Sequence, residues 1–199
     1  MPLTDNVGVA VLIGGKSSRM GSPKEQLITK DNQSFLMRIC SEMDFFKYRY
    51  ISHNSSQKYS YDGYRNVTDL IENIGPMGGI YSLLKTIESE SVLVVACDMP
   101  FYGSEAAVEI LEQYRGQDAV IPLCRGRREP LGGIYHRRII PVIEELIAHG
   151  DYRLGMLIDR VDCLQFESKY QVQYENLNNA DDYKRYLALS DRFEKRFPK

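Results

Sequence analysis

The chain has 199 residues, of which 43% are apolar, and a formal net charge of −2. This length is typical of a single domain, and the apolar content is sufficient for a sizeable core. The small net charge excludes a general electrostatic attraction to nucleic acid or to an anionic membrane, so we expect neither as a partner. An anionic ligand must then be held by local cations.

The first residues of the chain carry no targeting signal that we recognise. Residues 1–6 lack a basic leader, and the apolar run Val7–Ile13 is too short for a signal-peptide core or a membrane span. We therefore expect a cytoplasmic protein.

Apolar, β-rich runs alternate with helical patterns along the chain. The predicted strands are Val7–Ile13, Tyr48–Ser52, Asn66–Thr68, Val92–Ala96, Ala119–Pro122, Gly133–Tyr135 and Val161–Phe166. The predicted helices are Ser34–Phe45, Gly79–Ser89, Ser104–Tyr114, Ile140–His149 and a short one near Ala180–Leu189. The first and fourth strands are apolar without alternation, which is typical of strands covered on both faces. This order predicts an α/β fold with a parallel sheet and right-handed crossovers.

The cysteines and histidines lack the spaced pairs that zinc sites and disulfide frameworks use. The cysteines, each in an apolar or strand-like setting, are Cys40, Cys97, Cys124 and Cys163. The histidines, all isolated in the sequence, are His53, His136 and His149. We therefore expect free, buried thiols, and we interpret the histidines as surface or loop residues.

The loop after the first predicted strand combines glycines with cations. Its glycines and cations are Gly14, Gly15, Lys16, Arg19, Gly21 and Lys24. Glycines let the backbone turn sharply and approach a ligand, and the cations supply charge for a polyphosphate. The spacing fits neither the P-loop nor the dinucleotide fingerprint. We interpret the loop as a phosphate-binding element; the alternative is a loop that only connects strand to helix.

Two further strand ends are polar or rich in glycine. Asp69 follows the third predicted strand and precedes the segment 75–79, which reads GPMGG, and Asp98 directly follows the fourth strand. Ligands of open parallel sheets gather at the carboxyl ends of strands, so these residues are expected along one edge. The first amides of the helix opened by Gly78 and Gly79 are then placed to approach a sugar or phosphate, and close helix–sheet packing is the alternative.

Each of these aspartates has a functional and a structural interpretation. One carboxylate beside a phosphate loop meets the needs of Mg2+, so Asp98 is the predicted metal ligand; otherwise it caps the turn at Pro100 or the helix near Ser104. The carboxylate of Asp69 is suited to accept from a ribose hydroxyl or from guanine, which offers donors where cytosine offers an acceptor. A solvated turn residue explains Asp69 equally well.

The glycine-rich loop carries a resemblance to a known family. Residues 12–24 read LIGGKSSRMGSPK and resemble the nucleotidyltransferase signature L-x-G-G-x-S-x-R-M-G-x-x-K. Further blocks, GPMGG at 75–79, CDMP at 97–100, EPL at 129–131, YHR at 135–137 and NLNNADD at 176–182, are similar to those of the molybdenum cofactor guanylyltransferase (MobA) family. The resemblance extends from about residue 7 to residue 187.

This resemblance implies a Rossmann-like three-layer α/β fold of the nucleotide-diphospho-sugar transferase type, with a mostly parallel central sheet. It implies one nucleotidyltransferase domain over 1–199, with a nucleotide-binding part at about 7–115 and an acceptor-binding part at about 116–187. The implied activity is transfer of GMP from GTP to molybdopterin or the molybdenum cofactor, with Mg2+ as cofactor and release of pyrophosphate. Other cofactor-biosynthesis proteins and acceptor molybdoenzymes are the further partners it suggests.

The resemblance also assigns residues. The implied nucleotide-binding residues are Leu12, Ile13, Gly14, Gly15, Lys24, Ser52, Asp69, Gly79 and Asp98. The implied catalytic residues are Arg19, Lys24 and Asp98, with Asp98 also holding the metal, and Pro130 and Asn178 are placed toward the pterin. The chain departs from the family twice: Ser52, followed by His53, stands where the family often has Asn, and Asn179-Ala180 replaces Thr-Pro.

Several alternatives remain open at this point. A related enzyme using CTP or a sugar-phosphate acceptor is one, although Gly14-Gly15 in place of the Ala-Gly usual in cytidylyl relatives favours guanine. A nucleotide-binding accessory protein without turnover is another. Arg125, Arg127 and Arg128 suit either a nucleic-acid patch, a solvated turn or a pterin phosphate, and the lack of interleaved aromatic residues disfavours nucleic acid.

Overall fold

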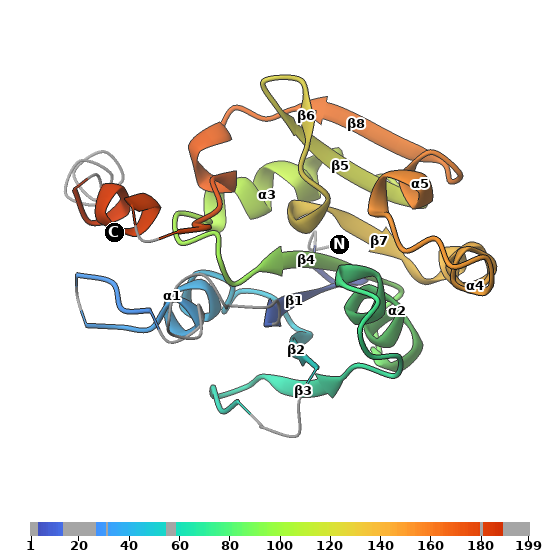
Figure 1. The fold of residues 1–199 in the computed structure, drawn as a ribbon, viewed down its shortest axis with the longest axis horizontal. Coiled ribbons are helices and arrows are strands. Elements are labelled where there is room, and N and C mark those ends of the chain that lie inside the picture. Colours follow the sequence, from blue (N-terminus) through green and yellow to red (C-terminus); the bar gives the residue numbers. More distant parts are fainter. Residues whose placement is uncertain (1–3, 14–26, 31, 55–58, 180, 189–199) are drawn as a thin grey trace.

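The fold is a sheet covered by helices on both faces (Figure 1). A computed structural model describes residues 4–13, 27–30, 32–54, 59–179 and 181–188. Among these residues, no helix is both long enough and apolar enough to cross a membrane. The α/β class predicted from the sequence is confirmed.

The described strands form one eight-stranded sheet. In chain order they are β1 (Val7–Ile13), β2 (Arg49–His53), β3 (Arg65–Thr68), β4 (Ser91–Ala96), β5 (Ala119–Cys124), β6 (Arg127–Arg128), β7 (Ile134–His136) and β8 (Cys163–Glu167). Their spatial order is β3-β2-β1-β4-β7-β5-β6, with β8 paired to β5. The pairs β1–β2, β1–β4, β2–β3 and β5–β8 are parallel.

One strand runs against the direction expected from the sequence. β7 is antiparallel to both β4 and β5, and β6 is antiparallel to β5, so the sheet is mixed. The remaining pairs are parallel, which confirms the expected mostly parallel sheet. Only residues 125–133 connect β5 to β7, and they contain β6 and the short 3-10 segment η2 (Pro130–Gly132). A parallel return needs a crossover of a dozen or more residues, so this connection enforces the antiparallel direction.

The helices form two layers on opposite faces of the sheet (Figure 1). The described helices are α1 (Phe35–Glu42), α2 (Pro76–Thr86), α3 (Ser104–Gln113), α4 (Ile140–Ala148) and α5 (Leu154–Ile158), and residues 181–188 are also helical. One core lies between the sheet and α1 and α3, and the other between the sheet and α2, α4 and α5. In β1, Val9 and Val11 face the first core and Ala10 faces the second, which explains its continuous apolar sequence.

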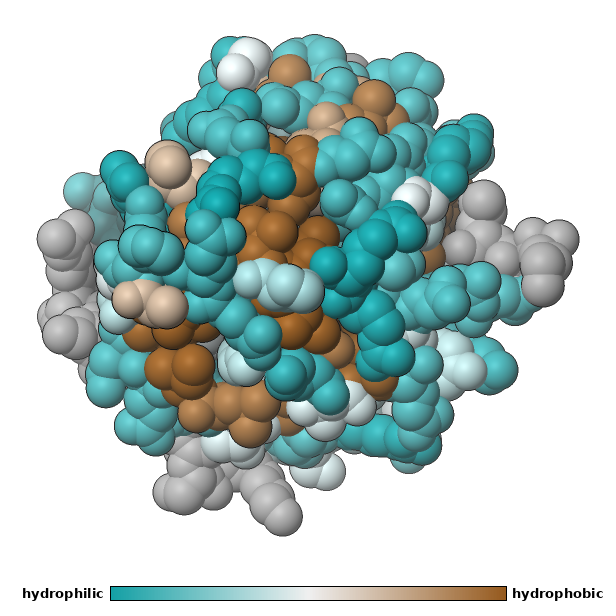
Figure 2. Space-filling model, turned by 90° about the vertical axis from the view of Figure 1, so that its right-hand side faces the viewer, coloured by the Kyte–Doolittle hydropathy of each residue, from teal (hydrophilic) through white to brown (hydrophobic). Residues whose placement is uncertain are grey.

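The outer side of the second layer is amphipathic. Figure 2 views the molecule from the side of α2 and α4 and shows apolar residues in a band between polar ones. Half-buried residues of α4 and α5, including Val142, Ile147, Leu154 and Met156, pack against the core beneath them. These side chains therefore form the outer margin of that core.

Helix boundaries differ from the predicted ones where local chemistry is specific. α2 begins at Pro76 rather than Gly79, because Gly75 adopts a φ of +65° at the N-cap and proline suits the first helical position. α3 has no cap from its own sequence. Instead, the side-chain oxygen of Gln173, which lies in the 3-10 segment η4 (Gln171–Tyr174), accepts from the amides of Gly103 (3.0 Å) and Ala106 (3.3 Å).

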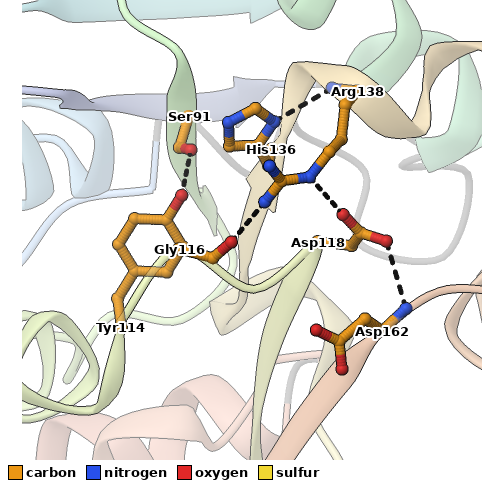
Figure 3. A network of polar contacts seen from close by, with 7 residues as sticks. All are labelled: Ser91, Tyr114, Gly116, Asp118, His136, Arg138 and Asp162. Atoms are coloured by element: carbon orange, nitrogen blue, oxygen red, sulfur yellow. Dashed lines mark hydrogen bonds and ion pairs between the residues drawn. The ribbon is translucent and has the colours of Figure 1, made fainter.

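A polar network joins the strands at the edge where β4, β5 and β8 begin (Figure 3). It consists of Ser91, Tyr114, Gly116, Asp118, His136, Arg138 and Asp162. The Arg138 guanidinium donates to the Asp118 carboxylate and the Gly116 carbonyl, and the His136 Nδ1 accepts from the Arg138 amide at 3.0 Å. Burial, and then the charge of Arg138, lower the pKa of His136 below its ordinary value of 6.5.

We expect this histidine to make folding pH-dependent. Because its pKa is lower in the folded chain, the unfolded chain binds more protons as the pH falls through 6.5, so stability decreases below that pH. His136→Asn keeps a side-chain acceptor without the titration. The free energy of unfolding, measured in urea, should therefore fall less between pH 7.5 and pH 5.5 in His136→Asn than in the wild type. An equal fall in both proteins would contradict the titration of His136 as a source of the pH dependence.

Candidate functional site at the carboxyl edge of the sheet

The strand order reverses at β1, and this creates the crevice where open sheets bind ligands. β1 lies between β2 and β4, while α1 and α2 lie on opposite faces of the sheet. Leu12 is paired with Ser52 on one side and with Ala96 on the other. The Cys97 amide donates to the Leu12 carbonyl at 3.1 Å, so Asp98 follows immediately beside the end of β1.

The glycine-rich loop itself lies outside the described residues. This applies to Gly14, Gly15, Lys16, Arg19, Gly21 and Lys24, so their predicted roles stay predictions. The described ends of this segment are Ile13, the last residue of β1, and Leu27, which precedes α1.

The structure brings four of the predicted nucleotide-binding residues together on the α2 side of this edge. A Cβ added to Gly79 would lie 3.2 Å from the Ser52 Oγ and 3.3 Å from a Leu12 methyl carbon, so α2 packs directly on the ends of β1 and β2. The Asp69 amide donates to the His53 carbonyl at 3.0 Å, which places Asp69 beside the end of β2. Leu12, Ser52, Asp69 and Gly79 therefore share one neighbourhood.

Asp69 is a half-buried carboxylate rather than a solvated turn residue. Its Oδ1 is buried and has no hydrogen-bond partner among the described residues. Burial is the largest influence on its pKa and raises it above the ordinary value, whereas His53 and Ser52 act in the opposite direction. A buried polar atom without a partner is rare in native proteins, and at a ligand site the bound molecule can supply the missing partner. The role of Asp69 in nucleotide binding stays a prediction.

The interpretation of His53 as a surface or loop residue is wrong. His53 is the last residue of β2 and is only 2% exposed. Its ring lies 5.8 Å from the ring of Tyr59, whose backbone is held by two hydrogen bonds to the Asn66 side chain. Successive strand residues face opposite sides, so Ser52 faces α2 while His53 faces the α1 layer. The alternation of side chains along β2 is the sequence feature that could have predicted the burial of His53.

Asp98 lies in the turn after β4 and is half-buried. The N-terminus of α3 is capped by residues other than Asp98. The Gln173 side-chain oxygen accepts from the amides of Gly103 and Ala106, and the Glu42 carboxylate accepts from the Ser104 amide. No group of three metal-ligating side chains occurs in the part of the chain that the structure describes. A single carboxylate at a phosphate site fits Mg2+, which completes its shell with phosphate oxygens and water.

The two predicted acceptor-side residues both lie near the end of β4. Pro130 begins η2, and Gly133, directly after η2, accepts through its carbonyl from the Val94 amide of β4 at 2.9 Å. The Asp98 carbonyl accepts from the Leu177 amide at 2.9 Å, which brings the exposed Asn178 to the same turn.

The departure from the family at residue 179 has a structural explanation that the sequence motif did not reveal. The Asn179 side-chain oxygen accepts from the amides of Asp181 and Asp182, both at 2.9 Å. The Asp182 carboxylate accepts in return from the amides of Asn178 and Asn179. This reciprocal arrangement is a capping box, so Asn179 is the N-cap of the helix at 181–188. The N-cap preference of Asn, followed by Asp three residues later, was the available signal.

The arginines near β6 are engaged in structural contacts. Arg127 is paired with the buried carboxylate of Glu129 at 2.8 Å, and Arg128 with Asp159 at 2.7 Å. The Arg125 amide donates to Glu167 and the residue has a φ of +54°, which is typical of a tight turn. These contacts support the turn interpretation of the three residues.

The mixed α/β sheet, whose strand order reverses at β1, places the protein among the open α/β folds that bind ligands at the carboxyl edge of the sheet. The chain belongs to the family of the MobA-like NTP transferase domain, whose model matches residues 9–164. The resemblance inferred from the sequence motifs is thereby confirmed.

Individual relatives support this placement. The chain is 29% identical over 205 residues to a probable molybdenum cofactor guanylyltransferase of Natranaerobius thermophilus, covering 95% of this chain and all of the relative. The crystal structure of molybdopterin-guanine dinucleotide biosynthesis protein A from Archaeoglobus fulgidus matches with a TM-score of 0.79 at 23% identity, covering 93% and 99% of the two chains. A 2-C-methyl-D-erythritol 4-phosphate cytidylyltransferase from Thermus thermophilus shares the fold, with a TM-score of 0.71 at 14% identity, covering 94% and 99%.

The two glycines at the start of α2 are expected to respond differently to alanine. A Cβ at Gly78 would lie 2.7 Å from the Ile71 carbonyl oxygen, a backbone atom, whereas at Gly79 it meets side chains at 3.2 Å or more. Gly78→Ala should therefore destabilise the protein by about 2 kcal/mol, and Gly79→Ala by less than about 1 kcal/mol. Urea unfolding measures both, and equal midpoints for the two variants would contradict this packing.

Proposed function

We propose that this protein transfers GMP from GTP to molybdopterin or the molybdenum cofactor, releasing pyrophosphate and forming the guanine dinucleotide form of the cofactor. Membership of the MobA-like NTP transferase family and the similarity to probable molybdenum cofactor guanylyltransferases support this activity. The same similarity underlies our proposal that the protein acts in the cytoplasm, alongside other cofactor-biosynthesis proteins and acceptor molybdoenzymes.

The buried Oδ1 of Asp69 is the observation that carries the preference for guanine. This atom lacks a donor among the described residues and lies beside Ser52 at the strand-order reversal. The Watson–Crick edge of guanine presents a ring N–H and an amino group, both donors. Cytosine presents an acceptor beside its amino group, which a carboxylate would repel. We therefore assign Asp69 to the nucleotide, with the donors of the guanine edge as its partners for base choice and a ribose hydroxyl as the alternative contact.

The chemistry needs little from the protein beyond positioning. The terminal phosphate of molybdopterin attacks the α-phosphorus of GTP, a new P–O bond forms, and the bond to the β-phosphate oxygen breaks with release of pyrophosphate. A phosphate monoester is mostly ionised near neutral pH, so no general base has to remove a proton. Catalysis then depends on alignment and on stabilisation of negative charge, and we assign Arg19 and Lys24 to the phosphates.

Magnesium fits the donor set at the end of β4. We propose that Asp98 holds Mg2+ together with phosphate oxygens of the nucleotide, because one half-buried carboxylate beside a polyphosphate is the usual protein share of such a site. When bound, the ion neutralises charge on the phosphates. Leu12 and Ile13 then line the nucleotide from the end of β1, and Pro130 and Asn178 are assigned to the pterin side.

The nucleotide choice has a direct test. Calorimetry with GTP and CTP, each with and without Mg2+, should show GTP binding at least tenfold tighter than CTP and a further gain with Mg2+. Asp69→Asn, which places an amide donor beside the base, should reduce this preference. Preferential CTP binding would favour the cytidylyltransferase alternative, and no effect of Mg2+ would contradict the proposed cofactor.

Turnover should depend strongly on the two charged residues. Asp98→Ala and Lys24→Ala should each lower GTP-dependent pyrophosphate release with molybdopterin by at least a hundredfold, because each removes charge stabilisation in the transition state. Asp62→Ala, an exposed turn residue away from the edge, is the matched control and should retain activity. Near-normal turnover in either site variant would contradict the proposal, and no turnover in the wild type would favour a non-catalytic accessory protein.

A further inference from the structure

Residues 177–179 and 181–188, which we call the C-terminal clamp, contact both sides of the proposed site. Leu177 and Tyr186 are buried in a small apolar cluster with Phe35 of α1 and Phe101 from the turn after β4. Leu27, the first described residue after the glycine-rich loop, packs against the same cluster. The cluster therefore joins the segment directly after that loop, the start of α1, the turn after β4 and the C-terminal clamp.

Aromatic contacts give this cluster a defined geometry. The ring of Tyr186 lies 5.1 Å from Phe35 and 4.9 Å from Phe101, and the ring of Tyr183 lies 6.0 Å from Phe35. Edge-on and tilted aromatic pairs of this kind add to the free energy gained from burial alone. The helix at 181–188 is thus held in one orientation, and its capping box at Asn179 and Asp182 fixes where it begins.

The Tyr183 hydroxyl makes a specific contact at the exit of the glycine-rich loop. It donates to the Ile28 carbonyl at 2.6 Å. Ile28 is bridged to Ser34, and the Thr29 amide donates to the Gln33 carbonyl at 2.7 Å, so residues 27–30 and 32–34 form the two sides of a small hairpin. The Phe35 amide closes its base by donating to the Leu27 carbonyl at 2.9 Å.

The clamp therefore acts on two parts of the site at once. At one end the Leu177 amide binds the carbonyl of Asp98, and at the other end Tyr183 binds the hairpin. Lys24 precedes Leu27 by only three positions in the sequence, so whatever holds the hairpin restricts where the lysine can reach. A buried cluster and two hydrogen bonds link the hairpin that follows the glycine-rich loop to the segments that carry Asp98 and Asn178.

We propose that the C-terminal clamp is a positioning element of the nucleotide site, and that the Tyr183 hydroxyl fixes the exit of the phosphate loop by its hydrogen bond to Ile28. This inference rests on the proposed function for the part played by Lys24. Tyr183 touches no reacting atom in this scheme. It acts through the hairpin on the phosphate contacts, and the effect belongs to GTP binding rather than to the pterin side.

The test removes one hydroxyl and keeps the ring. In Tyr183→Phe, the KM and the calorimetric Kd for GTP with Mg2+ should rise about fivefold, which corresponds to the loss of one hydrogen bond of roughly 1 kcal/mol. The KM for molybdopterin should stay within twofold of the wild-type value. Amide hydrogen exchange at residues 27–34 should accelerate in the ligand-free variant.

Tyr114→Phe is the matched control. It also deletes a tyrosine hydroxyl with a protein partner, the Ser91 hydroxyl at 2.7 Å, but at the opposite edge of the sheet. It should leave the KM for GTP and the exchange at residues 27–34 unchanged, even where its melting temperature falls as much as that of Tyr183→Phe. An equal rise of the GTP KM in both variants would mean general destabilisation and would overturn the positioning role.

The outcomes also separate this inference from the proposed function. Wild-type protein that neither binds GTP nor releases pyrophosphate would overturn the proposed function. The amide hydrogen exchange at residues 27–34 in Tyr183→Phe would then be the measurement that tests whether Tyr183 holds the hairpin. Unchanged exchange and an unchanged GTP KM in Tyr183→Phe would overturn the clamp while leaving the guanylyltransferase activity intact.

Discussion

The parallel pairing of β1 with β2 and β4 is the constraint on which the rest of the structure depends. β1 is hydrogen-bonded along both sides and covered on both faces, so its register with its neighbours is fixed by burial as well as by backbone bonds. A shift of one residue would turn Val9 and Val11 toward the layer that Ala10 now faces. Since all three strands run the same way, their last residues meet at one edge, and the polar residues that follow them are brought together.

The two edges of the sheet have different roles. The edge where β4, β5 and β8 begin is closed by the network around Arg138 and Asp118, in which the polar groups bond to one another. At the carboxyl edge, by contrast, the buried Oδ1 of Asp69 has no donor among the described residues. Buried polar atoms without partners cost free energy, and they are retained where a ligand supplies the missing bond. Asp69 is one of several described residues with such an atom, and it lies at the edge where the family's nucleotide chemistry is expected.

Much of the fold was predictable because it depends on local pattern. β1 was predicted with its observed bounds, since its apolar run is continuous. α3 and α4 were predicted to within one residue at the carboxyl end, since their apolar residues recur at helical spacing. α5 and β6 were missed because five and two residues give too little pattern to recognise. The antiparallel direction of β7 was also missed, because it follows from the short connection after β5 rather than from the residues of β7.

The sequence by itself determined the class of site to expect: glycines and cations after one strand and an aspartate after each of two others predict a nucleotide-binding edge, because backbone freedom and charge are properties of residue type. Only the tertiary structure decided which of these groups meet and in what environment. It buried His53, left Asp69 with an oxygen that makes no hydrogen bond to the described residues, assigned the cap of α3 to Gln173 and brought Leu177 to the turn after β4. These features depend on contacts between residues far apart in the chain, and such contacts exist only after the strands have paired and the helices have packed.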